Sequence, residues 1–212
     1  MSDSITSANS VLLIGVTGLY AAGKDQVSRI LRERGFSEID VDALGHRVLA
    51  DCRDDVVRLF GPVIIGPDSQ IDRRALGRIV FAHPGRLRRL EALLHPRMRE
   101  LVVQAVHSPG GGDYVINAAL LFPMGLAELA DLVLVVRAPF CTRWRRARTR
   151  DGLDWRAFLD RCRSQRKIVP KPGRESVDIH TIWNTRNLMY LTQQMDAIML
   201  RHATDVKKDG NP

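Results

Sequence analysis

Short runs of apolar residues alternate along the chain with longer segments in which apolar residues recur at helical spacing. Four runs, at 11–17, 36–41, 114–121 and 132–136, have the length and the β-branched content of strands. The first, third and fourth runs are nearly continuous in apolar residues, which is typical of strands covered on both faces. Because strands and helices take turns along the sequence, we predict an α/β fold with a parallel sheet.

The helices are predicted from apolar residues spaced three and four positions apart. They are 24–33, 73–81, a long segment after Pro84, an arginine-rich segment at 143–167 and a closing segment at 187–201. Pro96 falls inside the long segment, and because proline lacks a backbone N–H we expect a kink or two helices there. Polar residues 1–10 and 205–212 are expected to be flexible tails around a single domain at 11–204.

Composition and charge narrow the class of protein. The chain has 212 residues, of which 45% are hydrophobic and 26% charged, so collagen-like, mucin-like and disordered classes are excluded. Its formal net charge is +8, and its 32 basic residues comprise 27 arginines and 5 lysines. Arginine suits bidentate contacts with phosphate oxygens, so this surplus indicates an anionic partner. Composition leaves open whether that partner is nucleic acid, a membrane surface or a polyphosphate metabolite.

Cysteine content and the first apolar run bear on location. The three cysteines have no paired spacing, which argues against disulfides and a thiolate zinc site and favours a reducing compartment. The apolar run at 11–16 is too short to span a bilayer, and no basic segment precedes it. We therefore expect a cytoplasmic protein with neither a signal peptide nor a membrane segment.

Residues 18–24 have the sequence GLYAAGK, which matches the GxxxxGK pattern of a phosphate-binding P-loop. The motif lies between a predicted buried strand and a predicted helix, where glycines let backbone N–H groups surround phosphates and the helix N-terminus adds positive charge. Lys24 is expected to reach the β- and γ-phosphates. The alternative is a Gly/Ala-rich turn followed by a solvated lysine.

Asp25 follows the P-loop lysine, where this motif has a serine or threonine whose hydroxyl binds magnesium. A carboxylate is a good ligand for Mg²⁺, so we predict that Asp25 binds the metal directly or through water. Two alternatives stay open: the site is catalytically degraded, or Asp25 is only a first-turn acid that favours the helix dipole.

Asp40 and Asp42 lie at the carboxyl end of the second predicted strand. That end faces the P-loop in an open parallel sheet, and residues two apart on a strand point to one face. An aspartate there can accept a proton from an attacking hydroxyl or bind Mg²⁺ through water. The alternative is an N-cap for the helix expected from residue 43.

At this point the sequence resembles the dephospho-coenzyme A kinases. The motifs that carry the resemblance are TG…GK at 17–24, D-x-D at 40–42, FG at 60–61, D-R-x-x-L at 72–76, VF at 80–81, LE…LHP at 90–96, LLF at 120–122, R-D at 150–151 with Gln165, and Asn184. The His95-Pro96 pair is the most discriminating of them. The resemblance covers about 11–190, which is nearly the whole chain.

The resemblance implies a P-loop NTPase-type fold: a parallel five-stranded sheet with flanking helices, a helical substrate-binding insert at about 55–110 and a lid at about 140–170. It implies transfer of the γ-phosphate of ATP, with Mg²⁺, to the ribose 3′-hydroxyl of dephospho-CoA. The ATP-binding residues it implies are Gly18, Ala21, Ala22, Gly23, Lys24, Asp25, Gln26 and Asn184. Asp42 is implied as the base, Arg146 and Arg150 as lid arginines, and His95 and Arg74 as contacts of the CoA end.

Three departures mark the chain as a divergent member. Asp25 replaces Ser or Thr, residues 19–21 replace a more glycine-rich loop, and Asn117 and Pro123 replace acidic residues. Alternative functions are another small-molecule or nucleotide kinase, or a catalytically degraded P-loop nucleotide-binding protein.

Two features have further interpretations. The arginine run at 143–150, which includes an aromatic residue, suits a nucleic-acid surface or a solvated helix face as well as a lid. His95, considered alone, suits a buried structural histidine. The arginine run directly follows a predicted sheet strand, and this position favours the lid interpretation. We therefore expect ATP and dephospho-CoA as partners, and neither nucleic acid nor a membrane.

Overall fold

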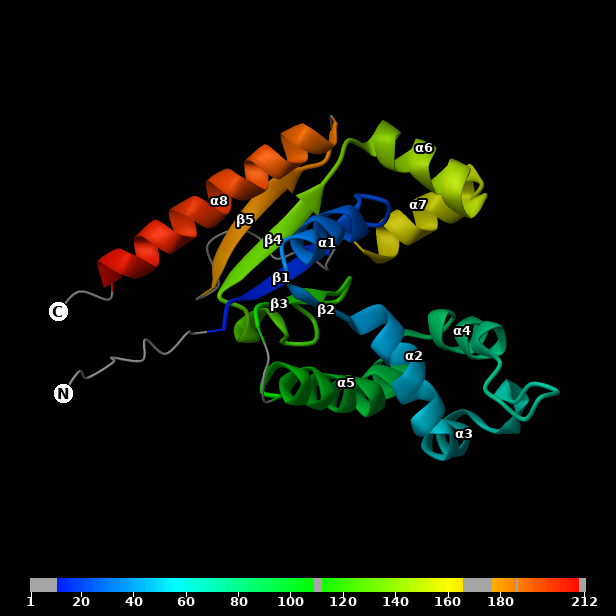
Figure 1. Cartoon of the computed structure of the whole chain (residues 1–212). Coiled ribbons are helices and arrows are strands. Elements are labelled where there is room, and N and C mark those ends of the chain that lie inside the picture. The colour runs from blue at the N-terminus through cyan, green and yellow to red at the C-terminus, as the bar shows by residue number, and fades with distance from the viewer. Residues whose placement is uncertain (1–10, 109–111, 166–176, 186, 210–212) are drawn as a thin grey trace, which may run out of the picture.

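A single parallel sheet organises the molecule. The computed structural model describes residues 11–108, 112–165, 177–185 and 187–209. Its sheet has five strands in the order β2-β3-β1-β4-β5, which confirms the predicted fold class (Figure 1). The strands are β1 (Leu13–Gly18), β2 (Ser37–Asp40), β3 (Tyr114–Asn117), β4 (Leu132–Arg137) and β5 (Asp178–Trp183).

The register of the strands brings their carboxyl ends to one edge. Val16 of β1 pairs with Asn117 of β3, and Gly18 pairs with Val136 of β4. All six residues of β1 are buried, as its continuous apolar sequence predicts. The loop after β1 therefore begins at the centre of the sheet, between the ends of β3 and β4.

Eight α-helices and two short 3₁₀ helices surround the sheet in the described part of the chain. They are α1 (Lys24–Glu33), α2 (Val41–Asp51), α3 (Arg53–Phe60), η1 (Pro62–Ile64), α4 (Arg73–Phe81), α5 (Pro84–Val106), η2 (Ala127–Leu129), α6 (Phe140–Asp151), α7 (Trp155–Ser164) and α8 (Leu188–Asp209). None of these helices has the length and apolar content needed to cross a membrane.

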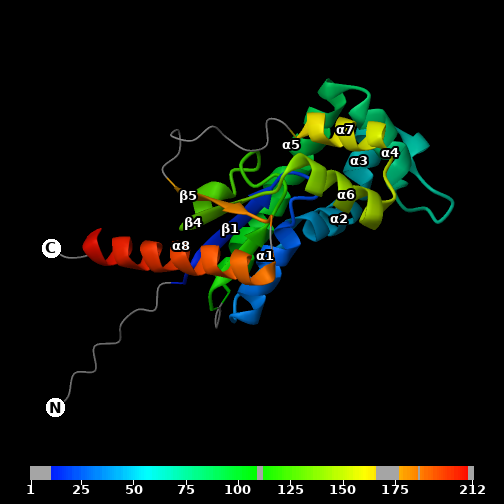
Figure 2. The same ribbon diagram turned by 90° about the horizontal axis from the view of Figure 1, so that it is seen from above.

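Alternate residues of the strands pack into two separate hydrophobic cores, one on each face of the sheet. On one face, Ile14 and Val16 of β1 pack with apolar residues of α1 and α8. On the other face, Leu13 and Ile116 pack with residues of α2 and α5. Figures 1 and 2 show α8 along β5, with α5 on the opposite side of the sheet. The strands are thus covered on both faces, which explains their unbroken apolar sequence.

The helices α2 to α5 form a helical body beside the sheet, in which α5 packs against both α2 and α4 (Figure 1). Asp72 caps α4 by accepting from the backbone N–H groups of Arg74 and Ala75, at 2.8 and 3.1 Å. Of the two outcomes expected at Pro96, a kink or two helices, the second is wrong: α5 is one helix that continues through it. The helix tolerates the lost hydrogen bond because tertiary packing fixes it on both sides of Pro96: Leu90 packs against the core before it, and Met98 is buried in the core after it.

The arginine-rich segment also differs from prediction, because it contains two helices instead of one. Gly152, with φ of 62°, ends α6 in a left-handed conformation, and Asp154 then caps α7 by accepting from Ala157 N at 2.8 Å. An aromatic cluster joins the pair: the ring centroids of Trp144 and Phe158 are 5.3 Å apart. Predicted lid residues 166–170 lie outside the described residues.

The observed ends of β2, β3 and the last helix differ from the predicted ones. β2 ends at Asp40 and β3 at Asn117, because the chain turns there into α2 and into a loop. Asp42 is therefore in the first turn of a helix, and the expectation that Asp40 and Asp42 share a strand face is wrong. At the other end, α8 continues to Asp209, into the segment expected to be a tail.

Leu191 of α8 is 1% exposed, whereas Leu200 on the same helix is 71% exposed. We therefore expect Leu191 to hold α8 to the sheet. Leu191→Ala should lower the free energy of unfolding by about 2–5 kcal/mol, because a buried leucine leaves a cavity. Leu200→Ala, with the same chemical change, should shift it by less than about 0.5 kcal/mol. Urea denaturation measures both; equal effects would contradict the proposed packing.

Candidate functional site

The P-loop needs glycine at two positions for different steric reasons. A Cβ on Gly18 would lie 2.4 Å from the carbonyl oxygen of Val136, so this strand end approaches β4 too closely for any side chain. Gly23 has φ of 98°, and a Cβ there would lie 2.2 Å from Nδ2 of Asn184. Ala21 also adopts a left-handed conformation, with φ of 60°, where the L side chain is strained. The loop is therefore built by close packing as well as by backbone freedom.

The carbonyl groups of the P-loop are bound by α6 and by Asn184. Arg143 Nε donates to the Tyr20 carbonyl at 2.7 Å, and Arg146 Nη1 donates to the Ala22 carbonyl at 2.9 Å. Asn184 Nδ2 also donates to Ala22 O, at 3.1 Å. These contacts hold the loop from outside, and the N-terminus of α1 that follows the loop offers backbone N–H groups to an anion.

Arg146 is one of the predicted lid arginines, and the structure brings it to the P-loop. Its Nη2 atom donates to Oδ1 of Asn184 at 3.1 Å, while Nη1 holds Ala22. Burial, with a smaller effect from Arg145, lowers the pKa of Arg146 from its usual value. Arginine still stays charged at neutral pH. Arg146, Asn184 and Gln26, whose Oε1 accepts from Asn184 Nδ2 at 3.1 Å, thus form one network around the loop.

Lys24 lies between two partners at the carboxyl edge of the sheet. Its Nζ is 3.5 Å from Oδ2 of Asp42 and donates to Oδ1 of Asn117 at 3.4 Å. Asp40 caps α2 by accepting from Ala43 N at 2.9 Å, so the cap and the lysine partner are two different acids. Asp42 is left with a side chain that is 59% exposed beside the P-loop lysine.

Asp25 faces the same space. Its carboxylate accepts from Asn117 Nδ2 at 3.4 Å and lies 3.8 Å from Arg150 Nη1, and its side chain is 74% exposed. Among the described residues, no cluster of three or more His, Cys, Asp or Glu side chains forms a complete metal cage. The carboxylate of Asp25, which Asn117 orients through Nδ2, nevertheless fits Mg²⁺, which takes one or two protein oxygens and otherwise waters and phosphates.

Arg150 is anchored at the end of α6. Its Nε and Nη2 atoms donate to the two carboxylate oxygens of Asp151 at 2.9 and 3.1 Å. This bidentate pair raises the pKa of Arg150 and lowers that of Asp151. Arg150 also approaches Asp25, so the lid arginine and the residue after the P-loop lysine meet in space.

Two predicted residues lie elsewhere. Arg74 is on α4, where it lines an open cavity of about 500 Å³ together with Gly66, Asp68 and Ile71. His95 is on α5, where burial lowers its pKa and so favours the neutral imidazole. In the described part of the chain, no hydrogen bond or ion pair joins either residue to the P-loop.

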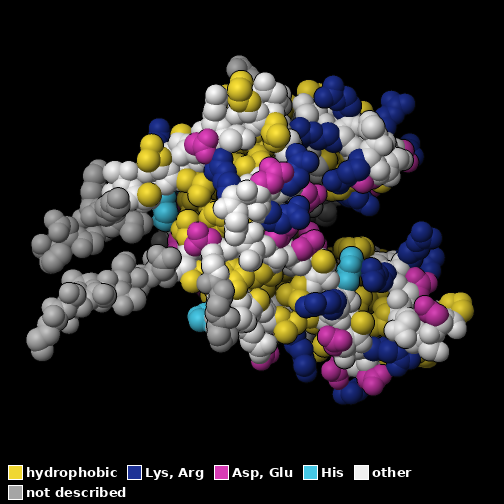
Figure 3. All heavy atoms as spheres, viewed as in Figure 1, with side chains coloured by type: hydrophobic (Ala, Val, Ile, Leu, Met, Phe, Trp, Pro, Cys, Tyr) yellow, Lys and Arg dark blue, Asp and Glu magenta, His cyan; other side chains and the backbone are white. Residues whose placement is uncertain are grey.

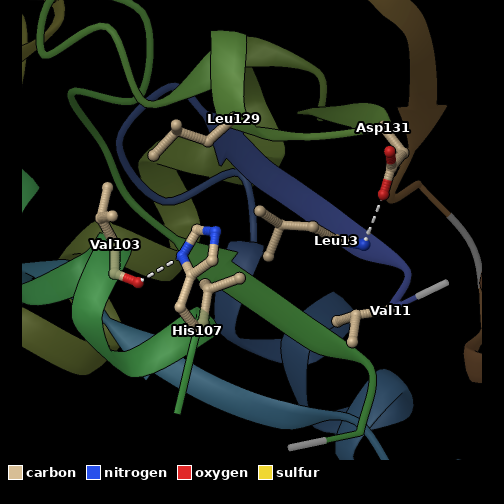
Figure 4. Close-up of a pocket in the computed structure, with 7 residues that line it drawn as sticks. Val11, Leu13, Val103, His107, Leu129 and Asp131 are labelled. Atoms are coloured by element: carbon tan, nitrogen blue, oxygen red, sulfur yellow. Dashed lines mark hydrogen bonds between the residues drawn. The ribbon is translucent and has the colours of Figure 1, made fainter.

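The surface is hollowed between the α6–α7 pair and the helical body, and Lys and Arg side chains line both margins (Figure 3). A smaller cavity of about 260 Å³ lies at the opposite, amino-terminal edge of the sheet. It is lined by Leu13, Val103, Leu129 and Asp131 among others, and Asp131 accepts from Leu13 N at 2.8 Å (Figure 4). The carboxyl edge is where ligands bind in open α/β sheets, so the hollow there is the candidate site.

Sequence reasoning did not give site roles to Asn117 and Tyr20. Asn117 is 5% exposed, and its amide connects Lys24, Asp25 and Glu38, which accepts from Nδ2 at 3.0 Å. A polar residue at the end of a buried strand next to the P-loop strand is the signal that points to it. Tyr20 contacts the α6–α7 pair, and the sequence around it contains no such signal.

The fold and this constellation define a P-loop phosphotransferase: a glycine loop at a helix N-terminus, its lysine, an exposed carboxylate beside that lysine, and arginines from a neighbouring helix. Comparison of sequences identifies the particular family. Residues 12–181 match the family description CoaE, dephospho-CoA kinase. The chain belongs to the dephospho-CoA kinase family.

Individual proteins are similar to this chain over most of its length. A dephospho-CoA kinase of Borreliella burgdorferi is 32% identical over 190 residues, covering 89% of this chain and 93% of the relative. The crystal structure of TT1252 from Thermus thermophilus superposes with a TM-score of 0.76 at 32% identity, covering 90% of this chain and 97% of that chain. A dephospho-CoA kinase from Campylobacter jejuni gives a TM-score of 0.62 at 26% identity, covering 89% and 95%.

The contact of Gly23 with Asn184 can be tested against a second glycine. Gly23→Ala and Gly35→Ala both place a side chain at a φ near +100°, which costs about 1–2 kcal/mol, but only Gly23 has an atom within 4 Å of the added Cβ. Gly23→Ala should weaken ATP binding at least tenfold by displacing Asn184, and Gly35→Ala should change it less than twofold. Calorimetric titration measures both; equal ATP affinities would contradict the packing argument.

Proposed function

We propose that this protein transfers the γ-phosphate of ATP to the ribose 3′-hydroxyl of dephospho-CoA, giving CoA and ADP. The observation that carries the proposal is the pairing of Lys24 with Asp42 at 3.5 Å beside a formed P-loop. The lysine is placed for the phosphates and the exposed carboxylate for an incoming hydroxyl. Membership of the dephospho-CoA kinase family supplies the acceptor.

The mechanism assigns one task to each group. Backbone N–H groups at the end of the P-loop and the start of α1 bind the phosphate oxygens of ATP, and Lys24 neutralises the β- and γ-phosphates. Asp42 orients the acceptor hydroxyl in line with the γ-phosphate and takes its proton. Arg146 and Arg150 stabilise charge that develops on the transferred group. Asp25, oriented by Asn117 Nδ2, would hold Mg²⁺, and the metal would supply charge neutralisation at the phosphates.

The two arms around the hollow have separate roles in this proposal. Residues 55–110 form the insert that binds the CoA end of the acceptor, and the open cavity beside Arg74 makes α4 part of that surface. His95, on α5, contributes from the same insert as a neutral imidazole. The α6–α7 pair is the lid, and Asn184 with Gln26 lies on the nucleotide side. Both substrates are small soluble metabolites, so we place the reaction in the cytoplasm.

The reaction is tested by incubating the protein with ATP, Mg²⁺ and dephospho-CoA and measuring CoA by mass spectrometry. We expect CoA and ADP in equal amounts. If ATP binds and no CoA forms above background, the protein is a nucleotide-binding member of the family and the proposal is wrong. If another nucleoside is phosphorylated with a higher kcat/KM than dephospho-CoA, that nucleoside is the acceptor and the acceptor assignment is wrong.

The base role of Asp42 predicts a selective loss of turnover. Asp42→Asn should reduce kcat by about 10²–10⁴-fold, because the amide cannot take the proton, while the ATP dissociation constant changes less than threefold. Asp40→Asn is the matched control, because asparagine caps a helix as well as aspartate does. It should keep wild-type kcat. A normal kcat in Asp42→Asn would contradict the assignment.

The metal role of Asp25 predicts a change in Mg²⁺ requirement. Asp25→Asn removes the charge from the proposed ligand and should raise the Mg²⁺ concentration for half-maximal ATP binding at least fivefold. Asp51→Asn changes an exposed carboxylate at the far end of α2 and serves as the control. Titration of ATP at several Mg²⁺ concentrations measures both variants without turnover. An unchanged Mg²⁺ dependence in Asp25→Asn would exclude a ligand role.

A further inference from the structure

Tyr20, in the middle of the P-loop, is the main contact between this loop and the α6–α7 pair. Its backbone N–H donates to Oε1 of Gln165 and its carbonyl accepts from Arg143. Its ring centroid is 4.8 Å from the guanidinium carbon of Arg161 and 6.4 Å from the ring of Phe158. The side chain therefore lies against the lid, and a cation stacks on its ring.

The hydroxyl of Tyr20 contacts both members of the Arg150–Asp151 pair. It donates to Oδ2 of Asp151, the acid that also holds Arg150. The carboxylate takes the Nε and Nη2 edge of Arg150, which leaves Nη1 directed at Asp25 across a distance of 3.8 Å. One chain of contacts thus runs from the P-loop through Tyr20, Asp151 and Arg150 back to the first turn of α1.

We propose that Tyr20 is a positioning residue: its hydroxyl fixes Asp151, and Asp151 orients Arg150 so that Nη1 points over the P-loop at the transferring phosphate. The proposal rests on the proposed function, in which Arg150 stabilises the transferred group. It assigns a role to Tyr20, a residue to which the sequence motifs gave none.

The physical need for such a device lies in the exposure of Arg150. Its side chain is 58% exposed, and a long exposed side chain samples many rotamers. A bidentate carboxylate limits that freedom, but Asp151 itself ends a helix next to Gly152 and needs an anchor of its own. The Tyr20 hydroxyl provides this anchor from a loop whose carbonyl groups α6 already binds, so less entropy is lost when ATP and the acceptor meet.

The protonation states suit a permanent contact. Burial, followed by the hydrogen bond to Asp151, raises the pKa of Tyr20 above its ordinary value near 10. The bond from Arg150 is the largest cause that lowers the pKa of Asp151. Tyr20 therefore remains a donor and Asp151 a carboxylate across the neutral range, and the contact should not change between about pH 6 and 9.

Tyr20→Phe tests the hydroxyl alone, since the backbone contacts and the ring stacking remain. We expect kcat to fall about tenfold, with the ATP dissociation constant within twofold of wild type. Asp151→Asn should show the same split. Because both changes break one chain of contacts, the double variant should lose about tenfold, well short of the hundredfold expected of independent residues.

Asp160→Asn is the matched control. Asp160 is an exposed carboxylate on α7 that pairs with Arg163 at 3.2 Å, so it resembles Asp151 in chemistry and is separate from the P-loop contacts. It should keep wild-type kcat. The melting temperatures of all variants should agree within about 3 °C, which separates positioning from general destabilisation.

Hydrogen–deuterium exchange of the amides at 150–155 gives a readout that does not depend on turnover. Exchange there, measured with ATP bound, should be faster in Tyr20→Phe than in wild type and unchanged in Asp160→Asn. If the wild type makes no CoA, the proposed function fails and exchange still decides whether the hydroxyl holds this turn. Unchanged exchange, unchanged kcat, or a loss of kcat matched by a loss of ATP affinity would each overturn the proposal.

Discussion

A tight loop ahead of a helix cannot satisfy all of its carbonyl groups internally, so the carbonyl groups of Tyr20 and Ala22 require partners from elsewhere, and the rest of the site depends on this constraint. Those partners are guanidinium groups from α6 and the amide of Asn184, which reach the carbonyls of Tyr20 and Ala22. Helix α6 therefore takes part in the hydrogen bonding of the loop. Through these bonds Arg146 is held within hydrogen-bond distance of the loop.

The arrangement of charged side chains around the loop shows what part of the net charge of +8 does. Around the loop, cations and anions are interleaved: Lys24 lies by Asp42, and Arg150 by Asp25 and Asp151. In the proposed reaction, the phosphates of ATP and their metal replace these partners in place, without charges being brought from a distance. The arginines of α6 thus offer defined geometry, whereas the charge surplus alone would have favoured nucleic acid equally well.

Much of the fold follows from local pattern. Helices at 24–33 and 73–81 have the predicted bounds, because amphipathic spacing and an Asp cap or a glycine turn are encoded within a few residues. Predictions failed where tertiary packing competes with local preference. Pro96 lies inside a continuous helix, and β2 ends at Asp40, which moves Asp42 from a strand to a helical turn.

By itself, the sequence determined the sheet-and-helix class, the P-loop with Lys24 and the family, since each is a pattern among neighbouring residues or a spacing of motifs. Only the tertiary structure decided which partners those groups have. Asn117 meets Lys24 across 93 positions and Tyr20 meets Asp151 across 131. Such contacts depend on the strand order and on where α6 ends. Neither contact can be predicted from periodicity in the sequence, because each involves single polar side chains that do not recur at a regular spacing.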